Sequence, residues 1–364
     1  MIDTLYTNIS IFGTGCLLFG FGLCFLFVHI PESPALRNYR VARRVMACAY
    51  LFFGAVNVLE YGAHSADVHV PLTRMVTLVV ACSQAFLFTY TLITLVNIRF
   101  VTRRRIIREL IPIALFIATA FVVYYACSTA SFRLFFYVFL FFYLYLLIRF
   151  TRLFLANYRG YCFQMDNYFS EEESRRLRWV YFSFFAALAV GITALLSALF
   201  MSPLGSLLFS VALMGFYLYF SIGFISYATV FHHIEEAITI EKQPEEENVK
   251  TDPIAFAAIE EKVEEWVRDK QFTEQKVTIE RLAAQLYTNR NYLSTYFNVH
   301  KKQTFRDWIN KLRIEEAKAL LHQHPDMTVS EIAFRVGFTD KSNFIRQFVK
   351  QTNVSPQVWR KESE

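Results

Sequence analysis

The stretch EIAFRVGFTDKSNFIRQF, Glu331–Phe348, predicts two short helices joined by a tight turn. Thr328 and Glu331 have the spacing of a capping box, which satisfies backbone N–H groups at the start of the first helix. Gly337 suits a turn that needs a left-handed backbone. Asp340 is a good N-cap for the second helix. Such a stretch is typical of a small soluble domain.

The same pattern occurs twice in the last quarter of the chain. The stretch LAAQLYTNRNYLSTYFNVHKKQTFRDWI, Leu282–Ile309, aligns with Ile332–Arg360, and Asn289 takes the place of the N-cap Asp340. Between the copies, Phe305–Leu321 has the apolar spacing of one helix, about 25 Å long at 1.5 Å per residue. We therefore expect two helix-turn-helix motifs joined by a single helix.

These two motifs resemble the tandem helix-turn-helix domain of the AraC/XylS family of bacterial transcription regulators, and the apolar first half of the chain resembles that of its membrane-anchored members. The resemblance covers about residues 276–360, under a quarter of the chain. It implies a domain that binds double-stranded DNA. Tyr287, Lys302 and Asn353 stand where the family usually has glycine. Because Lys tolerates a left-handed backbone less well than Asn does, we expect an irregular end to the first recognition helix.

The recognition helices carry the predicted base-reading residues. The first turns of such a helix lie against base edges in the major groove, where Arg can pair with guanine and Asn with adenine. A joining helix of this length suits two recognition helices in adjacent major grooves, about 34 Å apart. The predicted base-reading residues are Arg290, Asn291, Ser294 and Thr295 in the first motif, and Lys341, Ser342, Asn343 and Arg346 in the second.

Basic residues around the motifs are candidates for contacts with DNA phosphates, which position a protein without reading sequence. From Thr273 onward the chain has 15 basic and 10 acidic residues, a modest surplus. Any single Lys on such a surface can equally be an ordinary solvated charge. The predicted phosphate partners are Lys301, Lys302, Arg306, Lys350, Arg360 and Lys361.

The first 231 residues differ in composition from the rest, which predicts a domain boundary at that point. All 12 lysines lie at Lys242 or later, and 22 of the 31 acidic residues follow Phe231. The polar, acidic segment 232–253 is typical of a linker. Residues 254–272 predict a helix that either dimerises or packs on the domain behind it. The DNA-binding domain then spans residues 273–364.

Seven segments of residues 1–231 are apolar enough to cross a membrane, for which a helix needs about 20 residues. Connecting segments alternate between Arg-rich and Arg-poor, with 15 arginines on one side and 2 on the other. Because basic residues favour the cytoplasmic side, the N-terminus is predicted outside and the C-terminal domain inside a bacterial cytoplasmic membrane. The predicted fold is all-α, a seven-helix transmembrane bundle followed by the tandem helix-turn-helix domain. The segments are Leu5–Ile30, Val45–Ala63, Met75–Ile98, Leu110–Cys127, Leu134–Ile148 (extendable to Leu155), Trp179–Phe200 and Leu204–Phe231.

A polar stripe interrupts the second apolar segment. Asn57, Glu60 and His64 are spaced at i, i+3 and i+7, which places them on one face of a helix. Arg74 begins the next helix on the same predicted outer side and can pair with Glu60. Ionisable groups inside a membrane are functional candidates. The four residues therefore predict either a signal-binding site or a structural Glu–Arg pair.

The pattern favours a one-component membrane regulator, in which a signal at the membrane half changes DNA binding by the C-terminal domain. Its predicted partners are double-stranded DNA, the lipid bilayer, an unknown small-molecule or membrane signal, and a second copy of the chain as a homodimer. HExxH, GxSxG and P-loop motifs are absent, and the six cysteines lack metal-binding spacing. We therefore expect no enzyme activity, no metal and no cofactor. The alternatives are a transporter or enzyme with an attached DNA-binding module, or a membrane tether released by proteolysis.

Overall fold

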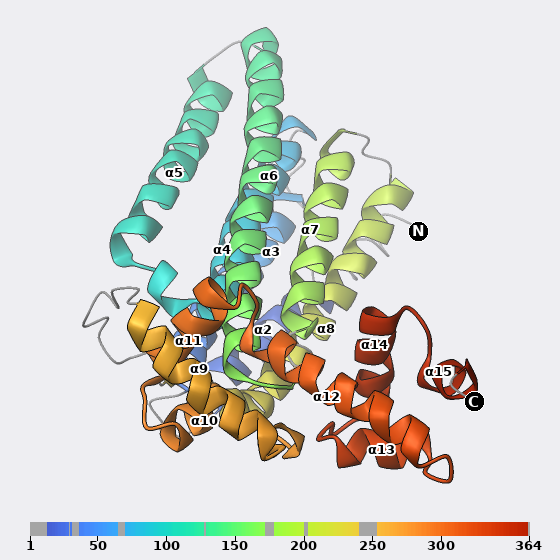
Figure 1. Cartoon of the computed structure of the whole chain (residues 1–364). Coiled ribbons are helices and arrows are strands. Elements are labelled where there is room, and N and C mark those ends of the chain that lie inside the picture. The colour runs from blue at the N-terminus through green and yellow to red at the C-terminus, as the bar shows by residue number, and fades with distance from the viewer. Residues whose placement is uncertain are drawn as a thin grey trace. The chain divides into compact units, whose positions relative to one another are not determined.

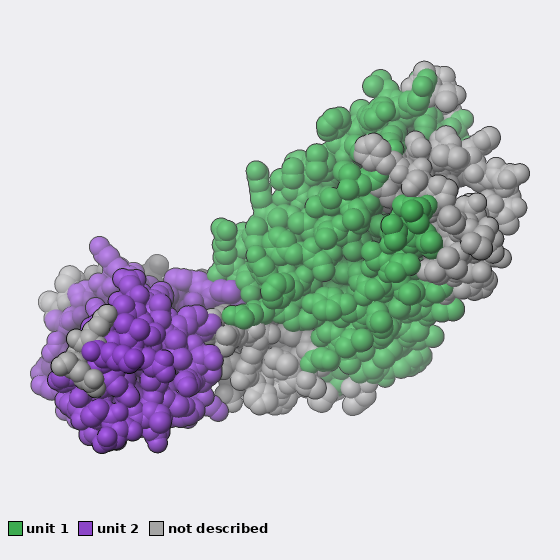
Figure 2. Space-filling model, turned by 90° about the vertical axis from the view of Figure 1, so that its right-hand side faces the viewer, with its two compact units in different colours: residues 1–159, 177–239 green, residues 160–176, 240–364 purple. Residues whose placement is uncertain are grey.

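The computed structural model describes residues 13–28, 30, 36–64, 70–126, 129–171, 178–199, 203–239 and 253–362. Within these ranges every regular element is a helix, apart from one isolated pair of bridged residues (Figure 1). The predicted all-α class is therefore confirmed for the described residues. The chain divides into two compact units, one of residues 1–159 and 177–239, the other of residues 160–176 and 240–364 (Figure 2).

The first unit consists of helices that match the seven predicted apolar segments in order. Five stretches are long and apolar enough to cross a membrane by length and composition: Leu78–Val96, Arg103–Tyr125, Ser131–Tyr168, Arg178–Leu196 and Leu207–Ser226. Among the described residues, α2 is shorter, and α3 carries four arginines in its first eight residues. The helices are α2 (Thr14–Phe27), α3 (Arg37–His64), α4 (Val70–Val96), α5 (Arg103–Ala126), α6 (Thr129–Tyr168), α7 (Arg178–Leu199) and α8 (Pro203–Thr239), with a 3-10 turn η2 (Ile98–Phe100) before α5.

Two helices continue past their predicted last residues, and α3 and α5 also begin earlier than predicted. The fifth apolar segment was expected to end at Ile148 or Leu155, but α6 continues to Tyr168. The last was expected to end at Phe231, but α8 continues to Thr239, inside the predicted linker. Hydropathy marks where an apolar stretch stops, whereas Arg, Gln and Glu beyond that point remain good helix formers. Most of the predicted connection between the fifth and sixth segments is therefore helical.

The core of the first unit is aromatic. Phe86, Phe139 and Phe150 are buried in one cluster with residues of α4, α5, α6 and α7. Buried tyrosine hydroxyls join the helices. Tyr143 Oη on α6, for example, donates to the Gly191 carbonyl oxygen on α7 at 3.0 Å. Such hydrogen bonds satisfy polar groups that an apolar interior would otherwise leave without a partner.

The second unit contains the two predicted motifs and the helix between them. The order of its elements is motif, long helix, motif, with an additional helix in front and one behind (orange to red in Figure 1). Residues 160–171, which include the last turns of α6, also belong to this unit. Its other elements are α9 (Pro253–Arg268), η5 (Gln271–Thr273), α10 (Ile279–Gln285), α11 (Arg290–Thr295), η6 (Tyr296–His300), α12 (Phe305–Gln323), α13 (Val329–Arg335), α14 (Lys341–Thr352) and α15 (Pro356–Glu362).

Helix α9 packs on the first motif. Trp266 Nε1 donates to Gln285 Oε1 at 2.9 Å, and Lys262 Nζ donates to the Leu286 carbonyl oxygen at 3.0 Å. Phe256 is 5 % exposed. Helix α9 thus packs on the domain behind it, which is one of the two interpretations of residues 254–272.

A buried arginine and a glycine join the two motifs. Arg313 on α12 is fully buried, and its Nε and Nη2 donate to the carbonyl oxygens of Phe272 at 2.9 Å and Glu274 at 2.7 Å. Gly337 has a φ of 96°, and a Cβ added there would lie 2.5 Å from the Thr273 carbonyl oxygen. Only glycine fits that position, so the turn of the second motif packs directly against the segment before the first.

Candidate DNA-binding site

The first motif consists of α10, a turn and α11. Asn289 caps α11 as predicted, since its Oδ1 accepts from the Tyr292 backbone N–H at 2.7 Å. Thr278 caps α10 by accepting from the Arg281 backbone N–H at 3.2 Å. Tyr287 occupies the turn with a φ of 53° and is 92 % exposed. The side chain thus points to solvent while the backbone adopts the left-handed conformation that glycine usually supplies.

The second motif consists of α13, a turn and α14, and all its predicted caps are present. Thr328 and Glu331 form the capping box. Hydrogen bonds from Thr328 lower the pKa of the Glu331 carboxyl. Asp340 accepts from the backbone N–H groups of Ser342 and Asn343, both at 3.1 Å. These caps define where α14 begins, so its first two turns have a well-defined direction.

The ends of the two recognition helices differ, as the sequence predicted. After α11 the chain forms the π-helical turn η6, and Lys302 follows with a φ of 51°. Helix α14 ends instead at Asn353, with a φ of 63° and a regular bond from its N–H to the Val349 carbonyl oxygen. Asn adopts this conformation more readily than Lys, which agrees with the less regular end of the first helix.

The eight predicted base-reading residues lie on the first turns of α11 and α14, but their exposure differs. Asn343 is 8 % exposed, and its Oδ1 accepts from Arg346 Nη2 at 2.8 Å. Ser294 Oγ accepts from Asn298 Nδ2 at 3.2 Å. The exposed members are Asn291, Lys341 and Ser342, and the half-buried members are Arg290, Ser294, Thr295 and Arg346.

Several of the predicted phosphate partners already bind acceptors within the unit. Lys301 pairs with Glu260, and Arg306 pairs with Asp166. Lys350 lies 3.2 Å from Asp307 Oδ1. Arg360 donates to the carbonyl oxygens of Pro325 and Met327, at 3.2 and 2.7 Å, which ties α15 to the loop before α13. Lys302 and Lys361 are exposed.

Of the predicted signal-binding residues, Asn57 is the one whose side chain the structure describes. Its Nδ2 donates to the Phe53 carbonyl oxygen at 3.1 Å, one turn back along α3. The side chains of Glu60, His64 and Arg74 lie outside the described part of the chain. The pairing of Glu60 with Arg74 therefore stays a prediction.

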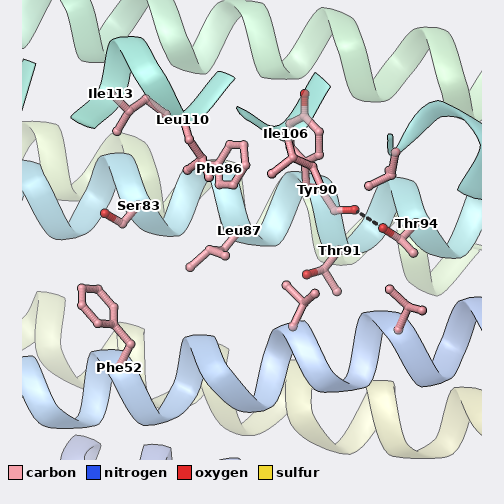
Figure 3. A pocket seen from close by; sticks show the side chains of 13 residues that line it. Phe52, Ser83, Phe86, Leu87, Tyr90, Thr91, Thr94, Ile106, Leu110 and Ile113 are labelled. Atoms are coloured by element: carbon pink, nitrogen blue, oxygen red, sulfur yellow. Dashed lines mark hydrogen bonds between the residues drawn. The ribbon is translucent and has the colours of Figure 1, made fainter. Parts of the chain in front are cut away.

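A cavity that the sequence did not predict lies between α3, α4 and α5 of the first unit (Figure 3). Its volume is about 350 Å³, and its lining is mostly apolar, with Phe52, Leu87 and Ile113 among the residues that form it. Asn57 is not part of the lining. Amphipathic and apolar side chains from three helices form it jointly, so no single segment of sequence carries a signal for it.

Comparison with known proteins agrees with this geometry. A family described as "Helix-turn-helix domain" matches residues 282–362. The uncharacterized HTH-type transcriptional regulator YijO of Escherichia coli (strain K12) is 37 % identical over 86 residues, 24 % of this chain and 30 % of the relative. The HTH-type transcriptional activator RhaR of Cronobacter sakazakii is 37 % identical over 70 residues, 19 % of this chain and 24 % of the relative. The melibiose operon regulatory protein of E. coli (strain K12) is 33 % identical over 91 residues, 25 % of this chain and 30 % of the relative.

The chain thus spans less than a third of the length of these relatives, and the likeness is confined to the end of the chain. No solved structure matches. The fold and caps define the C-terminal domain as a tandem helix-turn-helix domain. More particularly, residues 282–362 form an AraC-type domain, which confirms the resemblance for this part of the chain.

Proposed function

We propose that this protein is a membrane-embedded transcription regulator that reads DNA with α11 and α14 and responds to a signal at its membrane half. The observation that carries the proposal is two capped recognition helices, joined by α12, in the same chain as five helices long and apolar enough to cross a membrane. Helix α12 has 19 residues, or about 28 Å at 1.5 Å per residue. That length allows one chain to reach two adjacent major grooves, with a homodimer extending the site.

Arg346 and Lys350 give a direct test of base reading. Arg346 lies on the second turn of α14, so Arg346→Ala should weaken specific binding by about 1–3 kcal/mol and relax the preference at one base position. Lys350 lies one turn later, so Lys350→Ala should weaken binding to all sequences equally and reduce the salt slope by about one. The measurement is affinity across a panel of single-base variants at fixed salt. An unchanged base preference in Arg346→Ala would show that α14 does not read sequence.

The proposed topology has seven spans, an outside N-terminus and a cytoplasmic DNA-binding domain. A reporter that is active only outside the cytoplasm should be active after Asp67 or Ser131 and silent after Arg104 or Asn167. The reason is the arginine asymmetry, since Arg-rich connections stay on the cytoplasmic side. The reverse pattern would place the DNA-binding domain outside the cell, away from chromosomal DNA, and would contradict the whole proposal.

The polar stripe predicted on α3 is the proposed signal site, built from Asn57, Glu60 and His64, with Arg74 as the proposed partner of Glu60. Glu60→Gln removes the charge and keeps the shape, so the response to signal should fall at unchanged protein levels, as measured by a target-gene reporter. Leu87→Trp, which fills the cavity of Figure 3, is the contrasting variant. A normal response in Glu60→Gln and a lost response in Leu87→Trp would indicate that the signal binds in the cavity and not at the stripe.

Two alternative functions make different predictions. A transporter or enzyme with an attached DNA-binding module would still transport or convert its substrate when the DNA-contacting residues are replaced. A tether released by proteolysis would yield a shorter soluble fragment under inducing conditions, whereas the proposed regulator stays full-length. The size of the protein in cells with and without the inducing condition separates release from intact signalling.

A further inference from the structure

A segment of the α6 end packs against the DNA-binding domain, and we call residues 160–171 the arm. Phe169 and Thr278 form an antiparallel bridge, and the Ser170 N–H donates to the Val277 carbonyl oxygen at 3.1 Å. Tyr168 Oη donates to Glu280 Oε2 at 2.7 Å. The arm therefore adds a short strand-like contact at the start of α10, in the first motif.

Two carboxylates on the arm reach further into the domain. Asp166 pairs with Arg306, which lies in the first turn of α12. The Arg306 side chain is 13 % exposed. Glu171 accepts from the Lys276 backbone N–H at 3.1 Å and from Thr339 Oγ1 at 3.0 Å. Thr339 directly precedes Asp340, the N-cap of α14. The arm thus contacts the first motif, the joining helix and the turn of the second motif at once.

The donors that these carboxylates bind are of the kinds that hold DNA phosphates. Guanidinium, backbone N–H and hydroxyl groups all donate to phosphate oxygens in protein–DNA complexes. Carboxylate oxygens accept from the same groups in charge-assisted hydrogen bonds. Arg306 was itself a predicted phosphate partner. Asp166 and Glu171 therefore supply negative oxygens where a bound duplex would supply phosphates.

The contact between arm and domain is incompletely satisfied. On the arm, Asn167 Oδ1 and Ser170 Oγ are buried without a partner. Buried polar groups in folded proteins are nearly always hydrogen-bonded, so a contact that leaves two such atoms on the arm incomplete is easily displaced.

We propose that the arm is an autoinhibitory element that competes with DNA phosphates for the donors of the helix-turn-helix domain. The inference rests on the proposed function, since it assigns how that DNA-binding site is regulated. Helix α6 is continuous from Thr129 to Tyr168, so the arm directly continues a helix long and apolar enough to cross a membrane. In the arm-bound state Arg306 and Thr339 are occupied. In the released state they bind the duplex backbone.

The test uses the full chain in lipid nanodiscs and a duplex of about 40 base pairs selected from a random pool, long enough for two half-sites one helical turn apart. Asp166→Asn combined with Glu171→Gln should raise DNA affinity about tenfold, which corresponds to about 1.4 kcal/mol. The matched control, Glu315→Gln with Asp326→Asn, removes two exposed negative charges from the same unit outside the arm. Its affinity should change much less.

The outcomes separate the two proposals. An equal rise in both double variants would reduce the effect to net charge and overturn the autoinhibitory arm. Unchanged affinity in the arm variant, with normal binding by the wild type, would overturn it as well while leaving the proposed function standing. Failure of every variant and of the wild type to bind any selected duplex would overturn the proposed function itself.

A disulfide lock tests the same proposal with the opposite sign. Facing residues of an antiparallel pair have Cβ atoms about 4.5–5.5 Å apart, close to disulfide geometry. Phe169→Cys with Thr278→Cys, in a chain with Cys162→Ser, should bind DNA about tenfold more weakly when oxidised and recover with reductant. The Thr278→Cys chain alone controls for the lost helix cap. A locked chain that binds DNA as well as the reduced chain would show that arm and DNA do not compete.

Discussion

Replacing Phe348 by alanine should lower the free energy of unfolding of the DNA-binding domain by about 3–5 kcal/mol, the range for a fully buried Phe. Phe348 is 0 % exposed and lies in the core of the second motif. Its ring centroid is 5.7 Å from that of Phe344 and 6.0 Å from that of Trp359. The truncation leaves a cavity between α12, α14 and α15. Denaturant unfolding of the fragment from Asp252 onward measures the loss.

The neighbouring residue supplies the control. Val349 is 39 % exposed, so Val349→Ala should change stability by no more than about 0.5 kcal/mol, as expected for a surface substitution. Similar losses in Phe348→Ala and Val349→Ala would contradict the assignment of the inward face of α14. That face determines which side chains of the helix remain available for DNA.

Replacing Arg313 by methionine should have an effect of similar size, about 2–5 kcal/mol of unfolding free energy. The buried carbonyl oxygen of Phe272 and the part-buried one of Glu274 each lose a charged donor, at about 1–3 kcal/mol per unsatisfied buried group. Met keeps most of the volume, so the loss reports hydrogen bonding more than packing. Arg313→Met should also weaken DNA binding, because the segment before the first motif loses its attachment to the joining helix.

Lys311→Met, two residues earlier on α12, is the matched control, because Lys311 is exposed. It should leave the denaturation midpoint almost unchanged. If Arg313→Met unfolded at the same denaturant concentration as Lys311→Met, the buried arginine would not be a structural link between the motifs.

The second motif was predictable in detail because its signals are local. Thr328, Glu331 and Asp340 form hydrogen bonds with backbone groups two or three residues away, so the local sequence alone predicts the caps. Lys302 and Asn353 were identified from their positions after the recognition helices, and both adopt positive φ. Hydrophobic runs similarly placed the helices of the first unit, though not their ends.

Features that join distant segments were not predictable. Arg313 lies in the charged helix sequence LRIEEAK. From the sequence alone it cannot be distinguished from a solvated arginine, because the carbonyl oxygens that surround it are brought there by the fold. The arm contacts are more distant still, since Glu171 and Thr339 are 168 residues apart. No periodicity or cap encodes a contact between the end of α6 and the turn of the second motif. The cavity between α3, α4 and α5 has the same origin.

Selection of DNA by the intact protein tests the central claim most directly. The full chain in nanodiscs would be incubated with a pool of random duplexes, and the retained sequences would be read over repeated rounds. The account predicts two blocks of base preference with centres about 10–10.5 base pairs apart, because α11 and α14 enter adjacent major grooves on one face of the DNA. Retained DNA without any sequence preference, or with one isolated block, would contradict a regulator that reads DNA through two motifs.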